Sequence, residues 1–229
     1  MSSKPQTQDA MYAYVISDFF QFLSTSLRLP NHELAKAILD GSYGQDAISI
    51  LGELACSLGD ITKVQETFKG FTSHEEEETP FLIQMRREYT RLFDDPKKPA
   101  VNIYETLFLH NPEGGSQEVT LFISQAALDV ERCYNKAGVC LLKQSAEPAD
   151  HMATELEFMM YLYAKKGKAL QGHDIEEIEK FEGMIKEFAD LHLNKWCWDF
   201  FNKLESETDF EPYQALCHIG KAGLRKVLI

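Results

Sequence analysis

The chain has 229 residues, and its 44% hydrophobic content, with 15 Phe and 9 Tyr, is enough to bury a sizeable core within one domain. Its formal charge of −13 argues against a nucleic-acid-binding protein, because neutralising phosphates requires clustered Lys and Arg. The five cysteines are widely spaced and form no CxxC pair, which argues against a disulfide framework and against a zinc site. A polar start and the lack of an 18-residue apolar run predict a cytoplasmic protein without a membrane span.

Apolar residues in the first third of the chain recur at three- and four-residue steps, which is the period of an α-helix. We expect residues 1–8 to be flexible and a helix to cover 12–27, followed by one short helix. Glycines at 41 and 44 predict a break over 41–44. Two further helices are then expected over 47–58 and 61–71.

The middle of the chain contains one long helix and one long loop. Leu and aromatic residues on one face predict a helix over 82–93. Prolines, glycines and charged residues predict a long loop region over 94–118, in which 104–110 has strand-like composition. A helix over about 121–137 should end at Gly138, which is suited to a left-handed cap.

The last third is again helical, after a hinge loop over 138–150 that carries a dense polar motif. A glycine-flanked basic stretch over 167–172 predicts a connector. The expected helices cover 152–163, 174–195, 197–205 and the residues from 211 onward. The sequence therefore predicts an all-α protein, a single globular helical domain over 1–229 with about nine to eleven helices.

The motif is Glu147-Pro148-Ala149-Asp150-His151, with Glu155 one turn further on. Proline suits the first turn of a helix, where its missing N–H leaves no hydrogen bond unmade. Asp150 would lie near the positive end of the helix dipole. His151 is four residues from both Glu147 and Glu155, so both carboxylates can approach its ring on one helical face and favour its protonated form.

Four interpretations of these residues remain open from the pattern alone. They can form a structural cap, or a recognition site for a basic peptide beside apolar surface. Acid–base catalysis by Asp150 and His151 lacks an accompanying nucleophile motif, since neither GxSxG nor HExxH occurs. A di-iron bundle site requires Glu-x-x-His twice, whereas the spacing here is Glu-x-x-x-His and occurs once, so no metal or other cofactor is predicted.

The motif resembles the E-P-x-D-H signature of the TorD/DmsD/NarJ family of chaperones for molybdenum-containing oxidoreductases. Residues 88–93, Glu-Tyr-Thr-Arg-Leu-Phe, with Pro96 and Tyr104-Glu105-Thr106, are similar to the family's Y-x-R-L-F…P…P-Y-E-S segment. His192-Leu193 with Trp196, followed by Phe210 and Tyr213, resembles its H-L-x-x-W…F-Y tail. Ile103 stands where the family often has proline, and Thr106 where it often has serine.

The resemblance implies an all-helical, TorD-like cytoplasmic chaperone that is not an enzyme. It implies binding of the twin-arginine signal peptide and apo-protein of a molybdenum oxidoreductase, whose export is delayed until the molybdopterin cofactor is inserted. Two arginines beside an apolar stretch would complement an acidic protein with aromatic surface. The implied peptide-binding residues are Glu147, Pro148, Asp150, His151, Glu155, Tyr89, Phe93, Pro96 and Tyr104.

In this interpretation Asp150 faces an arginine of the leader and His151 orients that carboxylate or contacts peptide backbone. Trp196 and His192 are expected to be structural. Two alternatives remain: a small helical hydrolase using Asp150 and His151, and a structural accessory subunit of a reductase. The chain is expected to act as a monomer or a domain-swapped dimer, without nucleic acid or stable membrane insertion.

Overall fold

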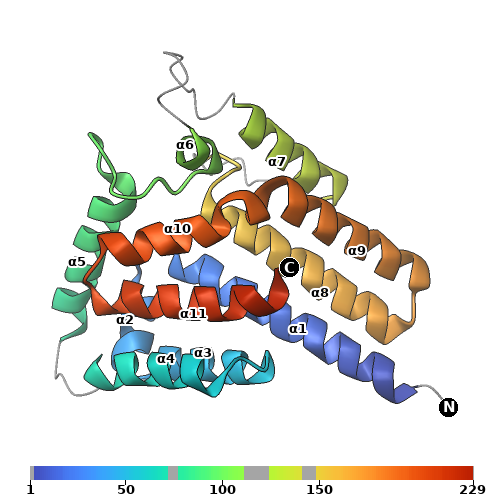
Figure 1. The fold of residues 1–229 in the computed structure, drawn as a ribbon, viewed down its shortest axis with the longest axis horizontal. Coiled ribbons are helices and arrows are strands. Elements are labelled where there is room, and N and C mark those ends of the chain that lie inside the picture. Colours follow the sequence, from blue (N-terminus) through green and yellow to red (C-terminus); the bar gives the residue numbers. More distant parts are fainter. Residues whose placement is uncertain (1–2, 72–76, 111–123, 141–147, 229) are drawn as a thin grey trace. The chain divides into compact units, whose positions relative to one another are not determined.

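The computed structural model describes residues 3–71, 77–110, 124–140 and 148–228 (Figure 1). These residues form the α-helices α1 to α11 and two π-helical turns, η1 and η4, which confirms the all-α prediction and the expected number of helices. Within these ranges β-pairing is limited to one antiparallel bridge between Tyr104 and His151. None of the described helices is both long enough and apolar enough to cross a membrane.

The chain divides into two compact units. Unit 1 comprises the start of the chain to Ser24 together with Asn102–Cys197, and unit 2 comprises Thr25–Val101 together with the C-terminal part from Trp198. The division falls within α1 (Ser3–Ser26) and within α10 (Asn194–Glu207). The expectation of a single domain stays a prediction. The Glu147–His151 motif belongs to unit 1.

In unit 1, α8 (Met152–Gly172) lies against α9 (Ile175–Phe188) and alongside α1 (Figure 1). The α1 contact includes two serines, because the hydroxyls of Ser17 and Ser24 donate to backbone carbonyls of α8 at 3.0 and 2.7 Å. A buried hydroxyl that finds an acceptor avoids the free-energy penalty of an unmade hydrogen bond. These bonds fix the position of α1 along the start of α8.

The connector expected over 167–172 is wrong, because α8 continues to Gly172 and ends at His173 with a left-handed φ of 55°. Gly167 lies inside the helix, and a Cβ there would be 3.0 Å from the ring of Tyr14 on α1. The glycine therefore permits close helix packing. It was read as a helix breaker because its partner is distant in sequence.

The loop predicted over 94–118 is also partly wrong, since it contains α6 (Glu105–Leu109). The next helix, α7 (Gln125–Lys136), begins later than expected, with the hydroxyl of Ser124 capping the N–H of Ala127. Gly138 has a left-handed φ of 78°, as predicted for its end. The helix expected over 174–195 is α9 followed by the π-helical turn η4 (Ala189–Leu193).

Unit 2 contains α2 (His32–Leu39), α3 (Ser42–Glu53) and α4 (Leu58–Phe71), and α4 packs on α3 and on α11 (Glu211–Val227). The break predicted over 41–44 is too long, because α3 already begins at Ser42. Gly44 lies inside α3, where a Cβ would be 2.9 Å from the ring of Phe68.

The second part of unit 2 is α5 (Glu78–Tyr89), which the π-helical turn η1 (Thr90–Asp94) extends. Phe93 in η1 forms the centre of an aromatic cluster, with ring centroids 5.2 Å from Tyr89, 6.2 Å from Phe200 and 5.9 Å from Tyr213. Edge-to-face and offset contacts at these distances stabilise a core beyond the burial of area alone. The helix predicted over 82–93 is therefore confirmed in type and extent.

Candidate functional site

The polar motif lies immediately before α8, and His151 is the N-cap of that helix. Its Nδ1 accepts a hydrogen bond of 3.1 Å from the backbone N–H of Ala153, so the ring nitrogen takes the role usually filled by a Ser or Asp oxygen. Pro148 is buried and precedes the helix, where a position in its first turn was expected. Glu147 lies outside the described residues.

Asp150 is completely buried and caps a different helix from the one it precedes. Its Oδ2 accepts from the backbone N–H of Thr106 at 2.9 Å and from the Thr106 hydroxyl at 2.5 Å. That hydroxyl also lies 2.6 Å from the hydroxyl of Ser124. Asp150 therefore satisfies the free N–H at the start of α6 from 44 residues further along the chain.

The backbone holds the same two segments together. The N–H of Glu105 donates to the carbonyl of Asp150, and the N–H of Met152 donates to the carbonyl of Ile103, both at 2.9 Å. These bonds flank the bridge between Tyr104 and His151, whose rings meet edge to face at 5.2 Å. The start of α6 and the start of α8 thus form one corner.

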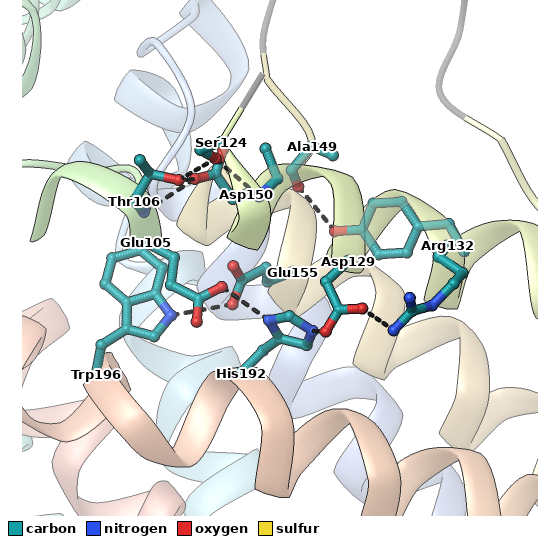
Figure 2. A network of polar contacts seen from close by, with 12 residues as sticks. Glu105, Thr106, Ser124, Asp129, Arg132, Ala149, Asp150, Glu155, His192 and Trp196 are labelled. Atoms are coloured by element: carbon teal, nitrogen blue, oxygen red, sulfur yellow. Dashed lines mark hydrogen bonds and ion pairs between the residues drawn. The ribbon is translucent and has the colours of Figure 1, made fainter. Parts of the chain in front are cut away.

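A second layer of ionisable groups lies behind this corner (Figure 2). Glu105 Oε2 is 2.8 Å from His192 Nδ1, and His192 Nε2 is 3.6 Å from Asp129 Oδ2, which also pairs with Arg132. In the same view Glu155 points toward Glu105 and His192. Glu155 Oε2 accepts from the indole N–H of Trp196 at 3.1 Å.

We call Glu105, Asp150 and Glu155 the acid cluster. All three side chains are at most 2% exposed. Two oxygens of the cluster, Asp150 Oδ1 and Glu155 Oε1, have no hydrogen-bond partner among the described residues, and the same holds for His192 Nε2. Buried carboxylate oxygens are normally hydrogen-bonded, so the cluster is incompletely satisfied.

Burial changes the protonation of these acids. It raises the pKa of Asp150, and the two hydrogen bonds from Thr106 oppose that rise. Burial, and then the nearby charge of Glu105, raise the pKa of Glu155 well above its ordinary value, while the Trp196 bond opposes them. A low-dielectric site that already holds one negative charge disfavours a second. Glu155 is therefore protonated at a pH where an exposed glutamate would be ionised.

The other predicted binding residues lie in different places. Tyr104 is half-buried at the corner, whereas Tyr89 and Phe93 are buried in the aromatic cluster of unit 2 and Pro96 is exposed in unit 2. The structure brings together the members of unit 1, which are Tyr104, Pro148, Asp150, His151 and Glu155.

Three contributors to the site were not predicted. Glu105 and Thr106 were noted only as part of a sequence block, and Asp129 carried no signal. A local pattern cannot find the pair of Glu105 and His192, because 87 residues separate them. His192 and Trp196 were expected to be structural, and both are buried with side-chain partners in the acid cluster.

The arrangement is suited to binding more than to catalysis. Asp150 and His151, the proposed acid–base pair, direct their described hydrogen bonds to Thr106 and to the backbone at the start of α8. Within the described ranges no group of three His, Cys, Asp or Glu side chains is placed to hold a metal ion. Buried acceptors without donors are instead complementary to a ligand that supplies N–H groups.

Comparison with known proteins places this helical corner in a defined class. Residues 59–202 match the family model described as nitrate reductase delta subunit, which is 144 of the 229 residues. The chain therefore belongs to this family, and the resemblance to TorD/DmsD/NarJ proteins is confirmed.

Two relatives are similar over part of the chain. One is the chlorate reductase assembly chaperone protein of Ideonella dechloratans, 30% identical over 119 residues, which are 48% of this chain and 61% of that protein. The other is the selenate reductase assembly chaperone protein of Thauera selenatis, 29% identical over 102 residues, 41% of this chain and 52% of that protein. The chain thus spans less than two thirds of the length of either relative.

Proposed function

We propose that this protein is a cytoplasmic assembly chaperone for a molybdenum-containing oxidoreductase. In this proposal it binds the twin-arginine signal peptide and the apo form of its client, and delays export until the molybdopterin cofactor has been inserted. It performs no turnover. The family membership and the names of the two relatives support the general role.

The observation that carries the proposal is the acid cluster at the start of α8. It holds buried carboxyl oxygens without donors at the position of the family signature. An arginine guanidinium has five N–H donors in a planar fork and no acceptor, which is the complementary set. The net charge of −13 favours the approach of a basic peptide.

Two other functions compete with this one. A hydrolase using Asp150 and His151 would need a nucleophile beside them, and the described hydrogen bonds of both residues serve helix capping. Measurable turnover that followed the protonation of one histidine would favour that enzyme. An accessory subunit of a reductase would co-purify with its partner in fixed stoichiometry, whereas a chaperone binds reversibly.

The experiment is a titration of the protein with a synthetic twin-arginine leader peptide, read by calorimetry. We expect a Kd of about micromolar or lower. A matched peptide with both arginines replaced by lysine should bind more weakly, because an ammonium cannot form the bidentate bond to a carboxylate. Equal binding of the two peptides would contradict guanidinium recognition.

The site assignment is tested by changing Asp150→Asn and His151→Gln together. Loss of a charge-assisted hydrogen bond should weaken binding by about 1–3 kcal/mol. The exposed Asp46→Asn serves as a control for the loss of one negative charge, and the helical circular dichroism of each variant checks the fold. Unchanged affinity in a folded double variant would overturn this assignment.

A further inference from the structure

The shortest α-helix of unit 1, α6, has the properties of a cover. It has five residues, fewer than an isolated helix needs to be stable in water. Its apolar side chains bury little area, because Leu107 and Phe108 are half-buried and Leu109 is 45% exposed. Segments with few buried apolar contacts open at a low free energy. What keeps α6 in place must come largely from its polar contacts.

Those contacts are concentrated on its first two residues. Thr106 donates its N–H and its hydroxyl to Asp150, and Glu105 pairs with His192 at 2.8 Å. Each contact uses a buried ionisable partner on another element. A set of this kind holds firmly when closed, yet a competing donor can replace it without disturbing an apolar core.

The groups beneath α6 are those that lack partners. Asp150 Oδ1 and Glu155 Oε1 are buried acceptors without donors, and Asp150 Oδ2 is bound only through the α6 residue Thr106 among the described contacts. The arginine of this network, Arg132, is engaged with Asp129 (Figure 2). The acid cluster therefore has spare capacity for one cationic donor group, and α6 stands in the way of it.

We propose that α6 is a displaceable cover over the acid cluster, and that an arginine of the bound peptide replaces Thr106 as the donor to Asp150. This rests on the proposed function and adds a regulatory step to it. Opening of α6 precedes tight binding, so the apparent Kd equals the intrinsic Kd divided by the fraction of molecules that are open. Contacts that close α6 consequently lower the affinity for the peptide.

The test uses Thr106→Val, which removes the hydroxyl donor and keeps the side-chain shape, the backbone N–H and all three carboxyls. Weakening the closed state should increase the hydrogen exchange rate of the α6 amides about tenfold and tighten the peptide Kd by a similar factor. A merely structural role for Thr106 predicts the reverse, because a damaged site binds more weakly. Thr106→Ala provides a second variant with the same expectation.

Two controls accompany these variants. Thr106→Ser keeps the hydroxyl and should leave both quantities unchanged. Thr67→Val makes the same chemical change on the exposed face of α4, where the hydroxyl bonds only to a backbone carbonyl in the described contacts, and should alter neither quantity. Unchanged or weaker binding in Thr106→Val and Thr106→Ala, with the fold intact, would overturn the cover.

The wild-type protein supplies a direct readout. Addition of the twin-arginine peptide should speed exchange at α6 while it protects the start of α8. Joint protection of α6 and α8 would mean that the peptide binds on top of a closed helix, and would overturn the displacement while leaving peptide binding intact. Failure of the wild-type protein to bind the peptide at all would instead overturn the proposed function.

Discussion

Glu155→Gln should make the stability of this protein less sensitive to pH. Glutamine has nearly the shape of glutamate and keeps an oxygen for the indole N–H of Trp196. It does not ionise. Wild-type Glu155 is fully buried, and burial together with the charge of Glu105 raises its pKa well above the ordinary 4.5. The variant therefore removes one titration from the interior and little else.

The sign follows from proton binding. Between pH 4.5 and the raised pKa, the folded state keeps the Glu155 proton while the unfolded state has lost it. Folding then takes up a proton, so the wild-type free energy of unfolding falls by up to about 1.4 kcal/mol for each pH unit in that window. Over two units the difference between Glu155→Gln and the wild type reaches as much as about 3 kcal/mol, in favour of the variant at the higher pH.

The assay is urea unfolding at pH 5, 6 and 7 at constant ionic strength, with stability taken from linear extrapolation. Asp150 titrates in both proteins, so its contribution cancels in the difference to first order. The exposed Glu179→Gln on α9 is the control, and its curve should run parallel to the wild type. If the Glu155→Gln and wild-type curves are also parallel from pH 5 to 7, Glu155 is not held protonated and the reasoning about burial is refuted.

Two further predictions concern packing and hydrogen bonding. Trp196→Phe should destabilise unit 1 by about 1–3 kcal/mol, because Glu155 loses its one described donor; the measurement is chemical unfolding, and a loss below 0.5 kcal/mol would contradict it. Gly220→Ala should lower stability by about 1–3 kcal/mol, since a Cβ there would lie 2.8 Å from the ring of Phe201. Gly183→Ala, on the exposed part of α9 with nothing within 4 Å, should instead raise the Tm, and equal effects of the two glycine changes would refute the packing argument.

The helices of this protein were predictable because each long one buries a stripe of apolar residues at helical spacing. The errors fell where a contact between distant segments decides the structure. Gly167 predicts a break until Tyr14 is seen against it, and α6 has no helical signal strong enough to compete with the prolines around it. Five residues form a helix there because Asp150 caps them from another part of the chain.

For the site, the sequence identified the right corner and a different use of its residues. Asp150 was expected to face an arginine of the peptide, and in the structure its carboxylate is bound to Thr106. His151 was expected between two carboxylates, and it caps α8. Local spacing shows which side chains share a helical face, but it carries no information about a partner 44 or 87 residues away.

The energetics of the acid cluster argue that it serves a function beyond stability. Burying a carboxyl group costs several kcal/mol unless hydrogen bonds compensate, and apolar side chains of the same volume would often stabilise such a site better. Here three acids are buried within one corner and two of their oxygens remain without donors. Departures of this kind from full satisfaction concentrate at functional sites. A guanidinium that entered beneath α6 would compensate both oxygens, so the protein would hold in its closed state the free energy that binding recovers.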